Sequence, residues 1–345
     1  MIAKTSVPAV FVRHRVRLLL ACLGVLVAFA VLACKSDKAA PSKAALRIAV
    51  IPKGTTHEFW KSVHAGAAKA ASELGLDIVW KGPLREDDLK AQIDVVQSFT
   101  AQGVSGIVVA PLSDKGLVSA VRQAVEAKIP VVIFDSDLQG HDHVSFVATD
   151  NFAAGKIAGE EMVRLVGGKG NVVVLRYNEG SASTTNRENG FLDVVRKTPG
   201  IKVVSDNQYG GATTETAHAT SENLLSATKA GAGGVDGIFC PNESTTFGML
   251  LALEKAGIAG KVHFIGFDSS VKLLEGLRQG HIDGLVLQNP FKMGYLAVQT
   301  ISRHLKGEKV DPRIDTGATL VTRQNVDQPE IKELVTPDLG KWLKE

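Results

Sequence analysis

The side chains in this chain that are best suited to bind a ligand recur just beyond the ends of buried strand-like runs. The run at 46–51 is apolar and rich in β-branched residues, and Pro52 ends it. Four residues with binding chemistry follow it closely: Lys53, His57, Phe59 and Trp60. Ligands of open parallel sheets bind beyond the carboxyl ends of the strands, so we expect a site here. The alternative is that Phe59 and Trp60 begin the core face of the next helix.

The same placement recurs along the rest of the chain. Strand-like runs at 130–134, 235–240, 261–267 and 284–287 are each followed by a polar residue, and a helix at 183–198 carries an arginine in its first turns. These residues are Asp135, Asn242, Asp268, Gln288 and Arg187. Carboxylates accept hydrogen bonds from hydroxyls, a guanidinium donates in a planar fork, amides do both, and aromatic faces cover C–H surface. The set suits a neutral polyhydroxylated molecule, although each residue alone also suits a helix cap or turn.

Enzyme motifs are missing from the sequence. His57-Glu58 lacks the second histidine of a metalloprotease, because position 61 is lysine. The glycine-rich stretch at 167–170 precedes a strand and has no Ser or Thr after its lysine, so it is not a phosphate-binding loop. No Gly-x-Ser-x-Gly sequence occurs, and the histidine pairs lack metal-ligand spacing. We therefore expect no catalysis, no metal and no cofactor.

The first 34 residues have the form of an export signal. Residues 1–17 carry four basic residues and no acid, and an apolar run of sixteen residues follows at 18–33. The run is slightly short for a membrane span and ends in Val-Leu-Ala before Cys34. This arrangement resembles the bacterial lipobox, whose cysteine is lipidated and becomes the new N-terminus. The alternative is an uncleaved signal anchor with an incidental cysteine.

Charge argues against a nucleic-acid-binding protein, and cysteine content argues against a disulfide-linked fold. Removing residues 1–33 leaves 35 basic against 36 acidic residues, so no basic stripe remains to indicate nucleic-acid binding. Cys22 leaves with the signal and Cys34 would carry lipid, which leaves Cys240 alone in an apolar strand. We expect a buried, unreactive thiol there and no internal disulfide. Residues 35–45 are small and polar, typical of a flexible tether.

The body of the chain predicts an α/β fold. Strand-like and helix-like segments alternate from residue 46 onward, which indicates parallel sheets with right-handed crossovers. We expect eleven strands, at about 46–52, 77–80, 105–110, 130–135, 144–148, 171–175, 201–205, 235–240, 261–267, 284–288 and 318–322. Such alternation also fits a barrel. Two open sheets are favoured because the strand at 144–148 follows its predecessor with no helix between, and a second series then begins at 171.

Several short segments, taken in order over residues 46–325, match one family. They include Arg-Ile-Ala-Val-Ile-Pro-Lys with Glu-Phe-Trp, Ile-Pro-Val-Val-Ile-Phe-Asp-Ser-Asp, Val-Ala-Thr-Asp-Asn, Ser-Thr-Thr-Asn-Arg-Glu-Asn-Gly-Phe, Ile-Phe-Cys-Pro-Asn-Glu, Phe-Ile-Gly-Phe-Asp and Leu-Val-Leu-Gln. The chain resembles the periplasmic sugar-binding proteins of ABC importers, in the ribose-binding group (type I, cluster B). The resemblance implies ligand roles for Phe59, Trp60, Asp135, Arg187, Asn242, Asp268 and Gln288.

The resemblance also implies the architecture: two Rossmann-like lobes with parallel sheets, joined by three crossings of the chain. After a signal at 1–33 and a lipidated tether at 34–45, residues 46–150 with about 289–317 would form the N-terminal lobe. Residues 151–288 with about 318–345 would form the C-terminal lobe.

The match is uneven between branches of the family. Ribose binders usually have Arg where this chain has Ser136, and Asn where it has Ala110. Pro-Lys and Asp-Ser-Asp instead resemble the rhamnose and autoinducer-2 branch, which implies a ligand role for Lys53. Autoinducer-2 binders, however, typically have an acid where Arg187 stands. The resemblance therefore leaves the identity of the sugar open.

The function implied is capture of a sugar or sugar-like polyol between the lobes and delivery to an ABC transporter permease. The protein would be a periplasmic, lipid-anchored monomer without bound cofactor. One alternative is a sensing subunit that presents its closed form to a chemoreceptor or sensor kinase. Another is a regulator of the lactose-repressor type, which the export signal and the lack of an N-terminal helix-turn-helix argue against.

Overall fold

The computed structural model describes residues 46–343. The signal, Cys34 and the tether that we expect in residues 1–45 lie outside the described residues.

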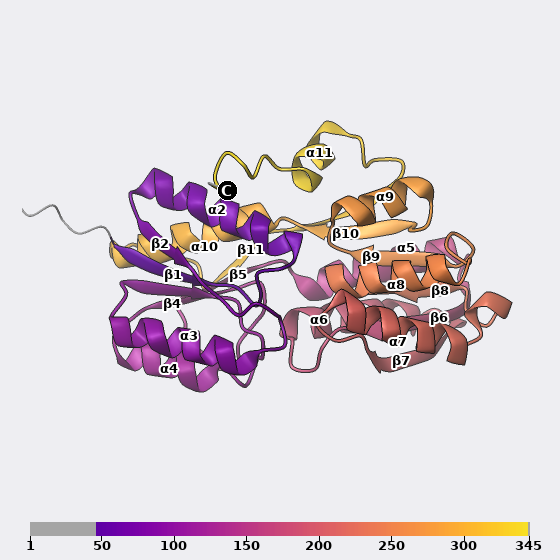
Figure 1. Cartoon of the computed structure of the whole chain (residues 1–345), viewed down its shortest axis with the longest axis horizontal. Coiled ribbons are helices and arrows are strands. Elements are labelled where there is room, and N and C mark those ends of the chain that lie inside the picture. Colours follow the sequence, from indigo (N-terminus) through magenta and orange to yellow (C-terminus); the bar gives the residue numbers. More distant parts are fainter. Residues whose placement is uncertain (1–45, 344–345) are drawn as a thin grey trace, which may run out of the picture. The chain divides into compact units, whose positions relative to one another are not determined.

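Two six-stranded sheets organise the described residues, and the chain does not close into a barrel (Figure 1). All strand pairs of the first sheet are parallel. Its strands, in spatial order, are β11 (Arg313–Asp315), β5 (Ser145–Ala148), β4 (Val131–Phe134), β3 (Gly106–Val109), β1 (Arg47–Ile51) and β2 (Asp77–Trp80).

Helices cover both faces of the first sheet. They are α2 (Glu58–Leu74) and α10 (Pro290–Leu305) on one face, and α3 (Leu89–Gln102) and α4 (Val118–Glu126) on the other. Alternate side chains of a strand point to opposite faces. Accordingly, Ile48 and Val50 pack with α2 and α10, whereas Ala49 and Ile51 pack with α3 and α4. Burial on both faces explains why this strand is a continuous apolar run. This sheet and its helices are the N-terminal lobe.

The second sheet has the same plan apart from one antiparallel edge. Its strands are β12 (Ala318–Thr322), β10 (Gly284–Gln288), β9 (His263–Phe267), β8 (Gly237–Phe239), β6 (Lys169–Arg176) and β7 (Gly200–Tyr209), and only β12 runs antiparallel to its neighbour. One face packs on α5 (Asn151–Leu165) and α6 (Ala182–Val195). The other packs on α7 (Thr214–Ala227), η1 (Ala230–Ala232), α8 (Glu243–Lys255), α9 (Val271–Gln279) and α11 (Pro329–Val335). We call this the C-terminal lobe.

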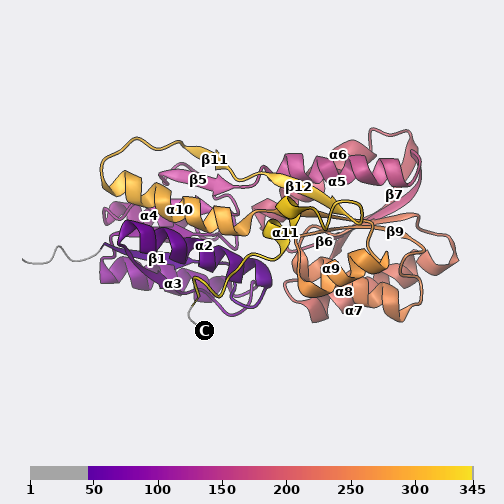
Figure 2. The same ribbon diagram turned by 90° about the horizontal axis from the view of Figure 1, so that it is seen from above.

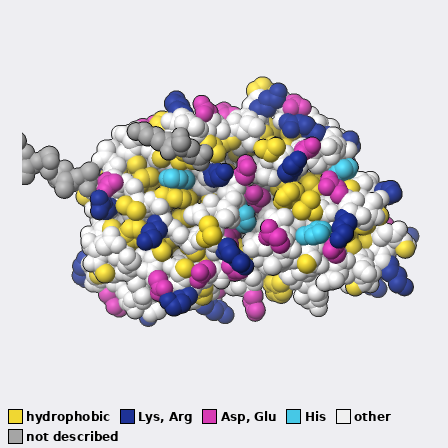
Figure 3. Space-filling view, in the orientation of Figure 1, with side chains coloured by type: hydrophobic (Ala, Val, Ile, Leu, Met, Phe, Trp, Pro, Cys, Tyr) yellow, Lys and Arg dark blue, Asp and Glu magenta, His cyan; other side chains and the backbone are white. Residues whose placement is uncertain are grey.

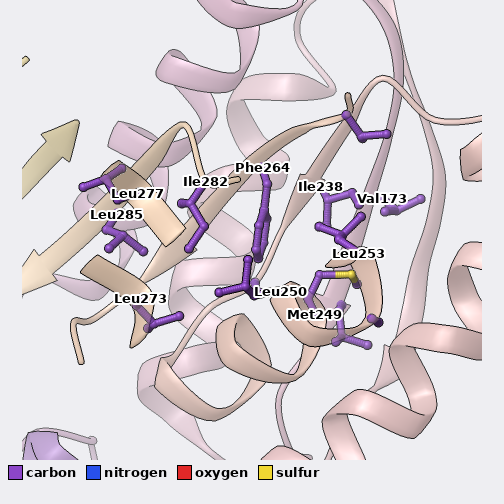
Figure 4. Close-up of a cluster of buried hydrophobic side chains, with 14 of the residues drawn as sticks. Val173, Ile238, Met249, Leu250, Leu253, Phe264, Leu273, Leu277, Ile282 and Leu285 are labelled. Atoms are coloured by element: carbon purple, nitrogen blue, oxygen red, sulfur yellow. The ribbon is translucent and has the colours of Figure 1, made fainter. Parts of the chain in front are cut away.

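The core of the C-terminal lobe is built from aliphatic side chains between α8, α9 and the sheet. Figure 4 shows Leu250 and Leu253 of α8 and Leu273 of α9 directed toward strand residues such as Phe264. Cys240 belongs to the same cluster and is fully buried. Burial raises the pKa of its thiol well above the ordinary value, so the thiol stays protonated and unreactive.

The chain passes between the two sheets three times, after β5, after β10 and after β11 (Figure 2). The first and third passages lie side by side, because the hydroxyl of Thr149 donates to the carbonyl of Gly317 at 3.2 Å. A carboxylate oxygen of Asp315 also accepts a hydrogen bond from the backbone N–H of Asp150 at 3.0 Å. These bonds tie two crossings into one short hinge.

Two features near the C-terminus were not expected from the sequence. β11 has only three residues, Arg-Ile-Asp, and is held by pairing with β5 rather than by an apolar run of its own. Beyond α11, Trp342 lies near Lys69 of α2, with the ammonium 5.9 Å from the ring centroid. The last described residues therefore reach from the C-terminal lobe to a helix of the N-terminal lobe.

The hydropathy of the helices and the distribution of surface charge bear on membrane and nucleic-acid binding. None of the helices within residues 46–343 has the length and apolar character needed to cross a membrane. On the face shown in Figure 3, basic and acidic side chains are interspersed. That face carries no basic stripe of the kind that binds nucleic acid.

The same device joins a helix pair in each lobe: glycines that let two helix backbones approach closely. A Cβ at Gly66 of α2 would lie 1.9 Å from the carbonyl oxygen of Phe291 in α10, and one at Gly294 would lie 2.1 Å from that of Val63. In the other lobe, a Cβ at Gly155 or Gly190 would meet a carbonyl oxygen of α6 or α5 at 2.0 or 2.1 Å. These contacts leave no room for a methyl group.

We therefore expect Gly66→Ala to lower the free energy of unfolding by about 1–3 kcal/mol, because the helices must move apart. Urea unfolding of the purified protein measures the change. Gly231→Ala is the control, since its Cβ would lie no closer than 3.5 Å to any neighbour. Equal stability of the two variants would contradict close helix packing at Gly66.

Candidate ligand-binding site

A small cavity lies between the two lobes at the carboxyl ends of their strands. It brings together all nine side chains selected from the sequence as ligand-binding: Lys53, His57, Phe59, Trp60, Asp135, Arg187, Asn242, Asp268 and Gln288. Its volume is about 30 Å³, so the side chains of the two lobes lie close together around it.

The two aspartates occupy equivalent places in the two lobes. Asp135 directly follows β4 and Asp268 directly follows β9, and each of these strands is next to the strand that leads to a crossing. Both have left-handed backbone conformations, with φ of 61° and 64°. Aspartate tolerates this region better than most residues, but it is still strained there. In each lobe the turn aims a carboxylate into the cavity instead of continuing the strand.

Arg187 is held by its own lobe and directed at Asp268. Its Nε donates to Oδ1 of Asn151 at 2.8 Å, and its Nη1 donates to the carbonyl of Pro241 at 3.0 Å. The guanidinium also lies over the ring of Phe267, 4.2 Å from the centroid. Nη1 remains 3.9 Å from the Asp268 carboxylate. The arginine is thus preorganised, with donor capacity left on the cavity side.

The amides complete the wall of the C-terminal lobe. Gln288, the last residue of β10, donates from Nε2 to Asp268 at 2.8 Å. Among the described residues its Oε1 has no hydrogen-bond partner, although the atom is buried. Asn242 caps α8 by accepting from the backbone N–H of Thr245. Asn242 is therefore both a helix cap and a cavity residue, the two roles that the sequence left open. Buried acceptors without partners are rare, so Gln288 Oε1 is well placed to accept from a ligand hydroxyl.

Lys53 connects the two lobes. Its ammonium lies 3.1 Å from the carboxylate of Asp135 in its own lobe. It also donates to the hydroxyls of Ser183 at 3.0 Å and Ser181 at 3.3 Å, both in the other lobe. The lysine is 3% exposed. A buried ammonium needs such partners, because its unpaired burial is very costly.

Phe59 and Trp60 belong both to the core and to the cavity wall. They pack edge to face, with ring centroids 4.9 Å apart, and they are part of the apolar cluster under α2. They also line the cavity. The two alternatives posed by the sequence are therefore not exclusive here. The indole Nε1 of Trp60 donates to Glu86 at 2.6 Å, which fixes the orientation of its ring.

A buried ion pair joins the N-cap residue of α2 to the loop after β2. The ring of His57 lies 2.6 Å from the carboxylate of Glu86. Burial by itself would lower the pKa of His57, but the Glu86 carboxylate raises it to about 9. Burial would raise the pKa of Glu86, yet His57, Lys53 and the Trp60 indole lower it to about 2. The pair is therefore ionised at neutral pH.

Five further cavity residues were not selected from the sequence: Glu86, Tyr177, Ser183, Thr184 and Glu243. Tyr177 follows β6, and Glu243 stands beside Asn242 in the polar pair after β8, so both carry the strand-end signal in the sequence. Ser183 and Thr184 lie in the first turn of α6, four and three residues before Arg187. Glu86 carries no such signal, because it comes from the loop after β2. Only the fold brings it to the site.

Some polar and aromatic residues near the strand ends or in the first turns of α6 lie outside this cavity. Trp80 stacks on His64, with centroids 4.5 Å apart, and Lys81 is exposed. Asn186 and Asp137 line a separate hollow of about 760 Å³ nearer the surface. Among the described residues, no group of three or more His, Cys, Asp or Glu is arranged to hold a metal ion.

The comparisons with known proteins agree with this geometry. Residues 48–309 match the periplasmic binding protein domain family. The chain belongs to this family. The ribose import binding protein of Salmonella typhimurium is 28% identical over 277 residues, which are 80% of this chain and 90% of that protein. The resemblance inferred from short segments is therefore confirmed at the level of the family.

Two solved structures of family members are closer in sequence. A carbohydrate transporter solute-binding protein from Agrobacterium radiobacter, in complex with D-arabinose, is 35% identical with a TM-score of 0.81 over 85% of this chain and all of that one. An ABC transporter solute-binding protein from Agrobacterium vitis with bound D-fucose is 36% identical with a TM-score of 0.80, over 84% and 99% of the two chains. The two-lobed α/β fold predicted from the sequence is thus shared with structures of this family.

The His57–Glu86 pair predicts a pH-dependent contribution to stability. The pKa of His57 is raised when the protein folds, so its stabilisation is complete below about pH 6.5 and is lost as pH rises through about 9. We expect His57→Gln to lower the free energy of unfolding by about 1.5–3 kcal/mol at pH 6. At pH 9.5 the loss should be clearly smaller.

Urea unfolding at the two pH values measures this difference. His281→Gln serves as the control, because His281 pairs with Glu254 at the surface and exposed pairs contribute little. The same cost for His57→Gln at both pH values would show that His57 does not act as a cation in the folded protein.

Proposed function

We propose that this protein captures an uncharged sugar or sugar-like polyol between its lobes and delivers it to an ABC transporter permease. The observation that carries the proposal is the composition of the interlobe cavity. Carboxylates, an arginine, two amides and the aromatic rings of Phe59, Trp60 and Tyr177 converge there from both lobes. Hydroxyl groups and C–H surface, the two features of a sugar, match these partners.

The charge balance of the cavity supports an uncharged ligand. Lys53, His57 and Arg187 supply three cationic side chains, and each faces a carboxylate: Asp135, Glu86 and Asp268 respectively. Neither a phosphate nor a carboxylate group on a ligand would find a free cation there without breaking one of these pairs. Neutral hydroxyls can join the pairs while leaving them intact.

Binding would act by shifting the population toward the closed form. Ligand contacts from both lobes exist together only when the lobes meet, so a ligand stabilises that arrangement by its differential affinity. The two crossings joined through Thr149 and Gly317 provide a short hinge for this motion. A closed form whose population rises with ligand can be recognised by a permease as the loaded state.

The relatives and one substituted position, Ser136, bear on the sugar specificity of this chain. D-arabinose and D-fucose, named for the two solved relatives, are the first candidates for this chain. Ser136, where ribose binders usually have arginine, is buried and accepts from the backbone N–H of Ser183. This contact uses the position for lobe closure, which argues against ribose as the preferred ligand.

The cellular placement follows from the sequence and the family. We propose export of the chain, cleavage before Cys34 and lipidation of that cysteine, so that the tether holds a monomeric binding protein outside the cytoplasm. Metabolic labelling with a palmitate analogue in a bacterial host tests this, with Cys34→Ala as the variant that must lose the label. An alternative role in presenting the closed form to a sensor has no specific observation in its favour.

Thermal unfolding of residues 35–345 with a ligand panel tests the proposed function. The panel contains D-arabinose, D-fucose, D-ribose, D-allose, xylitol and autoinducer-2, with ribose 5-phosphate as a charged counterpart of ribose. A ligand at about a hundred times its Kd adds about 2.7 kcal/mol of stability. We expect at least one neutral sugar or polyol to respond and the phosphate to give no shift. A panel without any responder would contradict the proposal.

Substitutions in the cavity should weaken binding of the responding sugar. We expect Arg187→Ala and Asp268→Asn to weaken it by about 1.5–3 kcal/mol, roughly 10- to 150-fold in Kd, as for hydrogen bonds to charged groups. Asparagine is chosen at 268 because it tolerates the left-handed backbone there. Isothermal titration calorimetry gives the affinities.

The matched control for Arg187 is Arg196→Ala. Arg196 follows the same helix and pairs with Asp206 at the surface, away from the cavity. It should leave Kd unchanged. Unaltered affinity in both cavity variants would overturn the assignment of the site.

A further inference from the structure

The first turn of α2 has no cap from its own segment. His57 occupies the N-cap position, but its side chain makes no capping hydrogen bond, because its ring is turned toward Glu86. The first backbone N–H groups of a helix have no partner within the helix and need one from outside. This turn also carries Phe59 and Trp60, the two rings of the cavity wall.

The missing cap comes from the other lobe. Glu243, the first residue of α8, accepts from the backbone N–H of Phe59 at 3.2 Å through Oε2 and from that of Glu58 at 3.4 Å through Oε1. A carboxylate at a helix N-terminus is favourable both as an acceptor and through the helix dipole. Glu243 itself is anchored, because its backbone N–H donates to Asp268 at 3.1 Å.

We propose that Glu243 is a positioning residue for ligand binding, which caps α2 across the cleft and so fixes the aromatic wall only when the lobes are together. This inference rests on the proposed function and deepens it, since it names a residue that couples closure to the arrangement of the site. Opening the lobes separates Glu243 from α2 and exposes both the carboxylate and the first backbone N–H groups of the helix to water. Closing the lobes reforms the hydrogen bonds between them.

Burial gives this contact a pH dependence. It raises the pKa of Glu243 to about 7, opposed by His57 and by the N–H of Phe59. In separated lobes the carboxyl meets water and its pKa returns toward the ordinary value of 4.5. Closure therefore takes up a proton between about pH 4.5 and 7, and Glu243 makes binding weaker as pH rises through that range.

Other charged groups share this environment, so the variants must be compared with wild type at each pH. The titratable groups that face Glu243 or line the same cavity are His57 and Glu58 at the start of α2, Glu86 and Lys53 in the N-terminal lobe, Asp135 after β4, Tyr177 after β6, Arg187 on α6 and Asp268 after β9. Burial also raises the pKa of Asp268, which contributes in the same direction and remains in every Glu243 variant.

The test measures Kd for the sugar that stabilises the wild type, between pH 5 and 8. We expect Glu243→Ala to weaken binding about 3- to 30-fold, the fold-change that corresponds to loss of a helix cap. Glu243→Gln keeps an acceptor and should retain most of the affinity. Because glutamine does not titrate, the affinity of this variant should rise relative to that of wild type as pH rises. Glu254→Ala, on the same helix at the surface, is the control and should change nothing.

Two variants of His57 distinguish capping of α2 by Glu243 from direct contact between Glu243 and the ligand. His57→Ser and His57→Ala both remove the imidazole, but only serine caps a helix well at this position. Added to His57→Ala, Glu243→Ala should cost its full fold-change, whereas added to His57→Ser it should cost little. Equal costs in the two backgrounds would overturn the proposal.

Hydrogen exchange of the ligand-free protein gives a readout that does not depend on the sugar. The amides of Glu58 and Phe59 should exchange faster in Glu243→Ala and be protected again in the double variant with His57→Ser. If wild type binds no sugar but this pattern appears, the proposed function fails while the cap stands. If wild type binds a sugar but the exchange rates of the two amides are the same with and without the Glu243 carboxylate, the cap is refuted and the proposed function stands.

Discussion

Buried charge between the lobes is the constraint on which this structure depends. Lys53, Asp135, Arg187 and Asp268 are each less than a tenth exposed, and unpaired charges at such depth cost several kcal/mol each. The closed arrangement exists because each charge finds a partner, some within its lobe and some across the cleft. The serine hydroxyls that meet Lys53 and the phenol of Tyr177 that donates to Glu86 at 2.7 Å are of the second kind.

The same constraint explains how a ligand can control closure. Most of these groups are anchored within one lobe, as Arg187 is by Asn151 and Pro241. They therefore keep their geometry when the lobes separate and lose only the contacts that cross. A sugar bound between the lobes offers its hydroxyls to these groups as the lobes close on it. Gln288 Oε1 has no hydrogen-bond partner within residues 46–343, so a ligand hydroxyl can donate to it without displacing another donor.

The two lobes solve the same structural problem with the same means. Each places an aspartate in a left-handed turn after the corresponding strand, and each joins its main helix pair through glycines that bring backbones into contact. The lobes differ in what surrounds the shared turn. The N-terminal lobe contributes aromatic rings and the His57–Glu86 pair, and the C-terminal lobe contributes arginine and amides. Membership of the periplasmic binding protein domain family accounts for the common plan, and these side chains account for the ligand class that we propose.

The sequence by itself determined the sheets and most of the cavity. Strands buried on both faces are continuous apolar runs, and the carboxyl ends of parallel strands converge. The polar residues after β1, β4, β8 and β9 and at the end of β10 were therefore identifiable from the sequence alone. β11 was not identifiable, because its three residues have no pattern and are held by pairing with β5. Nor was Glu86, which reaches the cavity only because the loop after β2 folds over Trp60. Tertiary structure alone decided these contacts and the cap that Glu243 provides to α2. Glu243 is 184 residues away from Phe59, whose backbone N–H donates to its carboxylate. A local sequence pattern cannot indicate a partner at that distance along the chain.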